Sequence, residues 1–141
     1  MPNRPHLPAD ETKPHTTGGY AILIVDDDAE MRAYIRHCLR TFAGGDHRIS
    51  EASDGQEGLV LLEMEPFDVM ITDVVMPRMD GLDLCRAARE RYPTMPVLLV
   101  SGEVPAEARR QAQLQHAGAA LAKPFNARKL RLTLDHLLDT S

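Results

Sequence analysis

The sequence has no apolar run long enough to span a membrane, and it has only two cysteines. A spanning helix needs about 20 consecutive apolar residues, and a secretory signal places an apolar stretch directly after a basic one. Neither pattern occurs, which favours a cytoplasmic protein with no membrane partner. Cys38 and Cys85 are too few and too far apart for a disulfide framework or a zinc site. We therefore expect two buried, reduced thiols.

Positive charge is also scarce. Sixteen Lys and Arg residues stand against 21 Asp and Glu residues, and the formal net charge is −5. A surface that binds nucleic acid through phosphate contacts is rich in basic side chains, so we predict no nucleic-acid partner. Only three of the basic residues are lysines, namely Lys13, Lys123 and Lys129. Lys123 lies in a mostly apolar stretch, which indicates a specific role.

The chain divides into a short polar leader and one domain. Residues 1–19 contain four prolines and show no hydrophobic period, which predicts a disordered leader. Residues 20–139 are enough for one domain with its own hydrophobic core. The last helical pattern ends near Leu138, so we expect no output domain after it.

The domain alternates five predicted strands with five helical patterns. The strands cover residues 20–25, 47–52, 67–72, 96–100 and 119–122. Residues 20–25 and 96–100 are continuous apolar runs, which are typical of strands buried on both faces of a sheet. The helical patterns follow at residues 31–42, 55–65, 82–88, 106–117 and 126–138. This (βα)5 order predicts an α/β fold, a doubly wound five-stranded parallel sheet with helices on both faces.

Apolar residues mark four of the helical patterns, and those of the first and last patterns are expected to lie on one face of their helix. They are Met31, Ile35, Cys38, Leu39 and Phe42 in the first pattern, Leu59, Leu62 and Met64 in the second, Leu82, Cys85 and Ala88 in the third, and Leu130, Leu134, Leu137 and Leu138, which should point inward, in the last. Gly44-Gly45 is predicted to end the first helix and Pro66 the second.

Polar residues follow four of the five predicted strands. The first strand ends in the run Asp26-Asp27-Asp28, the third in Asp73 and the fourth in Ser101, and Lys123 follows the fifth. Ligands of such sheets bind at the carboxyl ends of the strands, where the strand order reverses. If the sheet order brings strands one, three, four and five together, these side chains meet in one pocket.

The chemistry of that pocket points to phosphorus. Its carboxylates would repel one another unless a cation relieved the repulsion, and carboxylate oxygens, a backbone carbonyl and waters suit Mg²⁺. An ionised carboxylate such as Asp73 can attack phosphorus as a nucleophile. The ammonium of Lys123 and the hydroxyl of Ser101 would then meet the oxygens of the transferred group. The pattern predicts an aspartyl phosphate formed with Mg²⁺ as cofactor.

Each residue also has an ordinary structural interpretation. Asp28 is best explained as a helix cap, and for Asp26 and Asp27 alone the cap and the site are about equally good explanations. The residues at the other three strand ends could each be ordinary loop residues. It is much harder to attribute to chance that all four strand ends carry polar or charged side chains at one predicted crevice.

Several runs resemble the receiver domain of two-component response regulators, and the likeness covers about residues 20–139. The runs are Ile22-Leu23-Ile24-Val25-Asp26-Asp27-Asp28, Glu51-Ala52-Ser53-Asp54-Gly55-Gln56-Glu57-Gly58-Leu59, Phe67-Asp68-Val69-Met70-Ile71-Thr72-Asp73-Val74-Val75-Met76-Pro77 with Met79-Asp80-Gly81, and Lys123-Pro124-Phe125. The resemblance implies the flavodoxin-like receiver fold.

The resemblance also implies a role for each residue of the pocket. Asp73 becomes the phosphoacceptor, and Asp26 and Asp27 become the acid pair of the Mg²⁺ site, with Asp27 the more direct ligand and Asp26 acting through water. The backbone carbonyl of Val75 supplies a further metal ligand. Two more implied roles follow, the switch hydroxyl for Ser101 and the partner of a phosphoryl oxygen for Lys123. The Lys123–Pro124 bond is expected to be cis, which costs only about 0.5–1 kcal/mol over trans.

Two positions depart from the family pattern. Ala120 stands where the family often has a Tyr or Phe that swings inward with the hydroxyl, so an aromatic switch at this position is excluded. Val75 stands two residues after the acceptor, and its apolar side chain cannot orient a hydrolytic water. We therefore expect slow self-dephosphorylation.

As a receiver, the chain would be a phosphoacceptor and not an enzyme acting on a separate substrate. Its donor would be a histidine kinase or a histidine phosphotransfer protein, and a downstream protein of unknown identity would read its phosphorylated face. Docking to a target, as in chemotaxis-type single-domain regulators, and relay to another histidine both remain open, and Ala120 slightly favours the relay. The alternatives are a degenerate receiver that only binds partners and, less well supported, a small Mg²⁺-dependent phosphatase with an aspartyl nucleophile.

Overall fold

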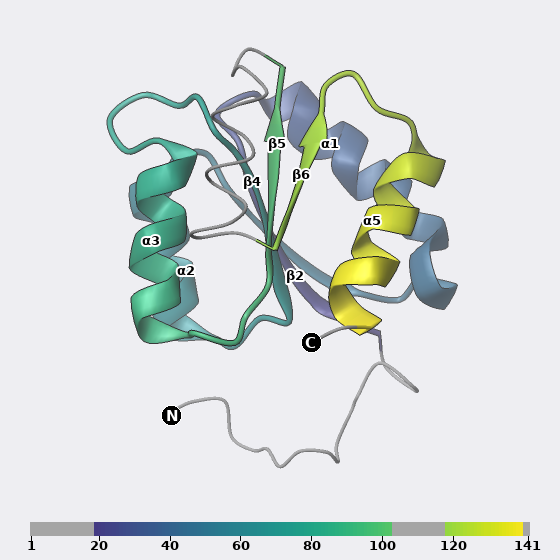
Figure 1. Cartoon of the computed structure of the whole chain (residues 1–141), viewed down its shortest axis with the longest axis horizontal. Coiled ribbons are helices and arrows are strands. Elements are labelled where there is room, and N and C mark those ends of the chain that lie inside the picture. Colours follow the sequence, from purple (N-terminus) through teal and green to yellow (C-terminus); the bar gives the residue numbers. More distant parts are fainter. Residues whose placement is uncertain (1–18, 103–117, 140–141) are drawn as a thin grey trace.

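The computed structural model describes residues 19–102 and 118–139. In this part of the chain, strands and helices alternate as the sequence predicts (Figure 1). The strands are β2 (Ala21–Val25), β3 (Arg48–Ala52), β4 (Val69–Asp73), β5 (Val97–Ser101) and β6 (Ala119–Ala122). The helices are α1 (Ala29–Cys38), the 3-10 helix η2 (Leu39–Gly44), α2 (Gly55–Met64), α3 (Gly81–Arg91) and α5 (Ala127–Asp139).

All five strands are parallel and form one sheet in the order β3-β2-β4-β5-β6. From β2 the chain first goes outward to β3, at one edge of the sheet. It then crosses to the other side of β2 and adds β4, β5 and β6 in turn, which makes the sheet doubly wound. The strand order reverses between β2 and β4. The predicted fold class is confirmed, and so is the expectation that strands one, three, four and five lie together.

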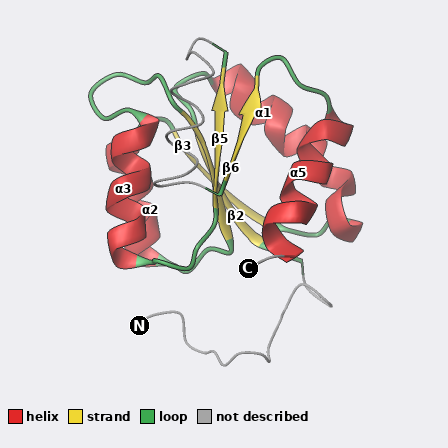
Figure 2. Ribbon diagram, viewed as in Figure 1, coloured by secondary structure: helices red, strands yellow, loops and turns green. Residues whose placement is uncertain are grey.

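Helices cover both faces of the sheet (Figure 2), and a hydrophobic cluster lies between the sheet and the helices on each face. Because side chains alternate along a strand, Leu23 and Val25 of β2 pack with α2 and α3, whereas Ile22 and Ile24 pack on the other face with α1 and α5. The central strands β4 and β5 are buried at every position. Burial on both faces explains why these strands consist mostly of apolar residues.

The helices begin at capping residues that the chain supplies at each turn. Asp28 accepts a hydrogen bond from the amide of Glu30, Asp54 from Glu57 and Asp80 from Asp83. A carboxylate at the N-cap satisfies an amide that would otherwise lack a partner and complements the helix dipole. The cap interpretation of Asp28 is therefore confirmed.

The first helix is shorter than predicted. The pattern over 31–42 indicated one helix, but α1 ends at Cys38 and the chain continues as η2. Phe42 has extended backbone angles, φ −76° and ψ 128°, and Ala43 is left-handed at φ 47°. Leu39 and Phe42 are nevertheless buried in the core. The apolar spacing therefore continues from α1 into the 3-10 helix, and this spacing does not reveal the change of helix type.

Two apolar residues of the second helical pattern lie in opposite environments. Met64 is 72% exposed at the last position of α2, while Leu62 is buried. Residues two apart on a helix point in nearly opposite directions, so burying Leu62 turns Met64 outward. Leu138 is only partly buried. The predicted helix over 106–117 and the leader over residues 1–18 lie outside the described residues.

Both cysteines are buried, as expected. Burial raises the pKa of the Cys38 thiol and raises that of Cys85 to about 11. Both side chains therefore stay neutral thiols and behave as small apolar groups of the core. None of the described helices combines the length and the hydropathy that crossing a bilayer requires.

Candidate functional site

The carboxyl ends of β2, β4, β5 and β6 meet at one edge of the sheet. Asp26 directly follows β2, Asp73 ends β4, Ser101 ends β5, and Lys123 directly follows β6. The register aligns Asp73 with Val100 and brings Ser101 beside β6. Since parallel strands end on the same side, the sheet order explains why these four segments, far apart in sequence, converge.

Three carboxylates gather at this edge. Asp26, Asp27 and Asp73 each offer an oxygen, and these atoms lie within 4.8 Å of one another. Asp26 and Asp73 are buried, whereas Asp27 is exposed at the mouth of the group. Within the described residues this cluster is the one group of acidic, His or Cys side chains close enough to hold a metal ion.

Lys123 faces two of the three carboxylates. Its Nζ atom lies 3.3 Å from Oδ1 of Asp73 and 3.4 Å from Oδ2 of Asp26. The Lys123 side chain is only 23% exposed, so its ammonium lies against the carboxylates rather than extending into solvent. The small number of lysines indicated a specific role for Lys123, and its contacts with Asp26 and Asp73 are consistent with such a role.

Ser101 and Val75 complete the set of predicted site residues. Ser101 is fully buried, and its carbonyl oxygen accepts a hydrogen bond from the Lys123 amide at 2.9 Å. Val75 lies two residues after Asp73 in the loop that follows β4, with a side chain that is 55% exposed. The structure thus brings the side chains of Asp26, Asp27, Asp73 and Lys123 close together. It places Ser101 at the end of the neighbouring strand β5 and Val75 in the loop that follows Asp73.

Local hydrogen bonds fix the two buried carboxylates. Oδ1 of Asp26 accepts from the Asp28 amide, and Oδ1 of Asp73 accepts from the Val74 amide, both at 2.9 Å. Both bonds come from backbone amides one or two residues further along the chain, at the point where each strand ends. The carboxylates are therefore ordered before any ligand arrives, as a preorganised site requires.

The pocket has more negative than positive charge. Burial raises the pKa of Asp26, and burial together with the charge of Asp26 raises that of Asp73; Lys123 offsets only part of either shift. A cluster of oxygen donors that one ammonium does not neutralise is suited to a small, hard dication. The residues present therefore fit Mg²⁺, with Asp26, Asp27 and Asp73 as the oxygen donors.

The same charge imbalance predicts how Asp26→Asn changes stability. Because the folded chain binds the Asp26 proton more tightly than the unfolded chain does, stability falls as the pH rises through the raised pKa. In EDTA at pH 7, Asp26→Asn should melt a few degrees above the native chain, and the difference should shrink at acidic pH. Asp135→Asn, which changes an exposed carboxylate of α5, is the control for thermal melting. A lower midpoint for Asp26→Asn at pH 7 would contradict this electrostatic account.

The segment after β6 is held by an unusual backbone and by a contact to α1. The Lys123–Pro124 peptide bond is cis, as predicted. The Tyr34 hydroxyl donates a hydrogen bond to the carbonyl of Phe125 at 2.6 Å, and the two rings pack with centroids 5.6 Å apart. α1 thus anchors the chain just beyond Lys123. Ala120 lies three residues before the lysine, partly buried against the core.

The loop after Asp73 is fastened at its far end. Gly81 donates its amide hydrogen to the carbonyl of Val74 at 2.7 Å, and Arg78 pairs with the capping carboxylate of Asp54 at 2.9 Å. Met79 packs directly over Gly55 at the start of α2. These contacts tie the acceptor loop to the two neighbouring helix starts.

Comparison with known proteins agrees with this geometry. The model of the response regulator receiver domain matches residues 22–135. The chain belongs to the response regulator receiver family. Its sheet order and flanking helices are those of the flavodoxin-like receiver fold, and its family places it in two-component signalling.

Relatives of very different length contain this domain. The chain is 37% identical to the chemotaxis protein CheY of Pseudomonas aeruginosa over 120 residues, 84% of this chain and 95% of CheY. It is 34% identical to the sensor histidine kinase TmoS of Ectopseudomonas mendocina over 83% of this chain but only 12% of TmoS. The crystal structure of CheY4 of Vibrio cholerae superposes with a TM-score of 0.75 at 32% identity, covering 84% of this chain and 98% of CheY4.

Sequence reasoning missed one residue at this site. Arg32 of α1 donates a hydrogen bond to the backbone carbonyl of Asp26 at 2.7 Å. No spacing rule links the first turns of a helix to the strand end before it, so the sequence carried no direct signal for the contact.

Proposed function

We propose that this receiver accepts a phosphoryl group on Asp73 from a phosphohistidine donor, with Mg²⁺ bound by the acidic cluster. The observation that carries the proposal is the convergence of three carboxylates and one ammonium at the switch point of the sheet. Family membership supports it, because the same residues carry the resemblance to receivers. Asp26 and Asp27 would hold the ion together with Asp73 and the carbonyl of Val75.

The transfer needs no base. A carboxylate oxygen of Asp73 forms a bond to phosphorus while the bond from phosphorus to the donor imidazole nitrogen breaks, and the imidazole takes back the electron pair. Bound Mg²⁺ would supply positive charge for the phosphoryl oxygens. Lys123 would release Asp73 and pair with a phosphoryl oxygen, and the Ser101 hydroxyl would donate to another.

Acetyl phosphate tests this proposal without knowledge of the native donor. The native chain and Asp73→Asn are incubated with Mg²⁺ and acetyl phosphate, and intact-mass spectrometry measures the adducts. We expect one phosphoryl adduct on the native chain, none on Asp73→Asn and none in EDTA. The absence of any adduct on the native chain would favour a receiver that only binds partners. Continuous release of phosphate from added phosphomonoesters would favour the phosphatase alternative.

Val75 should lengthen the life of the phosphoryl group. Val75 is 55% exposed close to the acceptor, and its apolar side chain offers an attacking water no hydrogen-bond partner. We expect Val75→Asn to lose phosphate several times faster than the native chain, measured by phosphate release after the donor is removed. Val75→Thr separates polarity from the loss of an apolar group. Equal lifetimes for all three chains would refute this role.

The partners follow from the chemistry. We propose a histidine kinase or a histidine phosphotransfer protein as donor and a separate protein as reader of the phosphorylated state, in the cytoplasm, where the thiols of Cys38 and Cys85 stay reduced. Ala120 supplies no aromatic ring that could swing with Ser101, which favours relay of the phosphoryl group over a large surface change. Transfer of the phosphoryl group from the phosphorylated chain to a purified histidine phosphotransfer protein would support the relay.

A further inference from the structure

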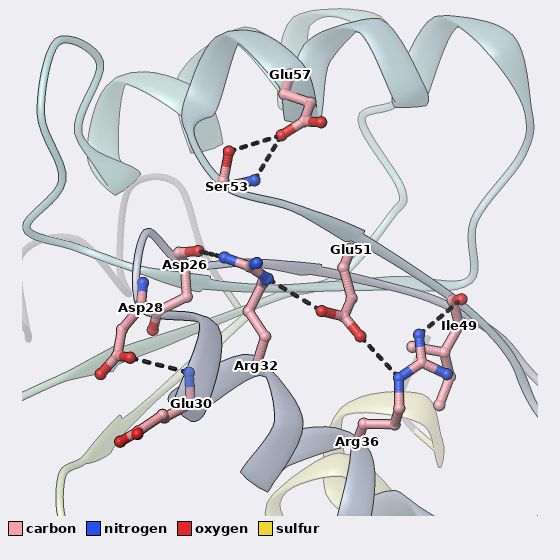
Figure 3. Close-up of polar contacts among 9 residues, drawn as sticks. All are labelled: Asp26, Asp28, Glu30, Arg32, Arg36, Ile49, Glu51, Ser53 and Glu57. Carbon is pink, nitrogen blue, oxygen red and sulfur yellow. Dashed lines mark hydrogen bonds and ion pairs between the residues drawn. The ribbon is translucent and has the colours of Figure 1, made fainter.

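The peptide unit that joins Asp26 to Asp27 needs a partner for its carbonyl. The amide of Asp26 still belongs to the sheet, since it donates to the carbonyl of Ala52 at 3.1 Å. Asp26 itself is 1% exposed, so its carbonyl oxygen has little access to water. Arg32 provides the partner, because its Nη1 atom donates to that oxygen at 2.7 Å (Figure 3).

A second contact holds the guanidinium of Arg32 in place. Its Nε atom donates to Oε1 of Glu51 at 3.0 Å, and Oε2 of Glu51 accepts from Arg36 at 2.7 Å (Figure 3). Although partial burial acts the other way, the hydrogen bonds from Arg36 and Arg32 lower the pKa of Glu51, so it stays ionised. The Arg32 side chain is only 18% exposed, against 48% for Arg36.

The network therefore spans three elements. Arg32 and Arg36 lie one turn apart on α1, Glu51 lies on β3, and the carbonyl that Arg32 binds lies at the end of β2. Arg36 also contacts the carbonyl of Ile49 at 3.4 Å, on the strand that forms one edge of the sheet. The rigid fork of a guanidinium can hold two acceptors at fixed angles, which an ammonium cannot do.

We propose that Arg32 is a positioning residue of the cation site, which sets the peptide unit between Asp26 and Asp27 and thereby the directions of both carboxylates. The inference rests on the proposed Mg²⁺ site. Mg²⁺ requires oxygen ligands in nearly ideal octahedral geometry at about 2.0–2.1 Å. Small rotations of this peptide unit therefore lower the affinity of the site for Mg²⁺. Loss of a group that supports metal ligands typically costs about 10- to 100-fold in affinity.

The sign of the effect distinguishes positioning from simple charge. Arg32 carries a positive charge close to the cation site, so by charge alone its removal should tighten Mg²⁺ binding. Positioning predicts the opposite. We expect Arg32→Gln to bind Mg²⁺ at least about tenfold more weakly than the native chain, and Arg32→Lys, which retains the charge without the fork, to be weakened as well.

Calorimetric titration with Mg²⁺ at fixed ionic strength tests this on the full chain. Arg48→Gln is the matched control, because it removes one positive charge from a partly exposed ion pair with Glu65, outside the network. Thermal melting in EDTA accompanies each titration and reports whether the variants are folded. Arg48 is the first residue of β3 and pairs with the start of β2, whereas the site lies at the other end of these strands. We therefore expect Arg48→Gln to bind Mg²⁺ within about twofold of the native chain, since charge at the far end of the strands is largely screened.

The outcomes separate this inference from the proposed function. A native chain that binds no Mg²⁺ would overturn the proposed site, and this inference with it. If the native chain binds Mg²⁺ and Arg32→Gln binds it equally well or more tightly, the positioning role of Arg32 is overturned and the proposed Mg²⁺ site is not. If Arg32→Gln does not fold, Arg32→Lys decides, and native affinity in that variant would overturn the role.

Discussion

Lys123→Met is expected to accept phosphoryl groups about 100- to 1,000-fold more slowly than the native chain. Lys123 contacts Asp73 at 3.3 Å and Asp26 at 3.4 Å from a largely enclosed position. Its ammonium is therefore already located where negative charge accumulates as the phosphoryl group arrives. Methionine has a similar length and shape but no charge, so the change removes the electrostatic contribution with little loss of packing.

Initial rates of adduct formation from acetyl phosphate measure this effect, at a Mg²⁺ concentration that saturates both chains. Saturation matters because losing a cation beside the metal site should tighten Mg²⁺ binding and mask part of the loss. Lys129→Met is the matched control, since Lys129 is an exposed residue of α5. Equal rates for Lys123→Met and Lys129→Met would remove Lys123 from the reaction.

Gly81→Ala is expected to destabilise the fold by about 3 kcal/mol and lower the melting temperature by about 10 °C. A Cβ atom at Gly81 would lie 2.1 Å from the carbonyl oxygen of Asp73 and 2.8 Å from the Cα of Val74. Both are backbone atoms, so neither can turn away as a side chain would. Alanine favours helices over glycine by only about 1 kcal/mol, which does not offset the clash.

The clash at Gly81 also displaces the acceptor itself, so phosphorylation of Gly81→Ala should slow even at temperatures where the variant is folded. Gly44→Ala provides the comparison. Gly44 has a φ of +86° but no atom within 4 Å of an added Cβ, so that change measures backbone strain without a steric clash, about 1–2 kcal/mol. Thermal and urea melts of the two variants check the order. A smaller loss for Gly81→Ala than for Gly44→Ala would contradict the packing described here.

The sequence was sufficient to predict the sheet and the pocket because both follow from simple periodic rules. β4 and β5 are buried at every position, so most of their residues had to be apolar. Parallel strands end on one side, so Asp73 at the end of β4 and Lys123 after β6 had to share an edge once the order was known. The cis bond before Pro124 came from the family resemblance alone.

Other features depend on three-dimensional relations that spacing does not encode. The α-helix α1 gives way to the 3-10 helix η2 at Leu39, although the apolar pattern continues unbroken to Phe42. The contact from Arg32 to Asp26 depends on how α1 lies against β3, because Glu51 must be in reach to orient the guanidinium. The exposure of Met64 depends on its angular position at the end of α2, which its apolar character alone does not reveal.

The central claim is that Asp73 itself carries the phosphoryl group, and chemical trapping tests it most directly. Borohydride reduces an aspartyl phosphate to homoserine, and peptide mass spectrometry then locates the reduced residue in the chain. After treatment with Mg²⁺ and acetyl phosphate, we predict homoserine at position 73 and at no other aspartate, including Asp26 and Asp27. Homoserine at a different position, or a phosphorylated chain with Asp73 unreduced, would contradict the account.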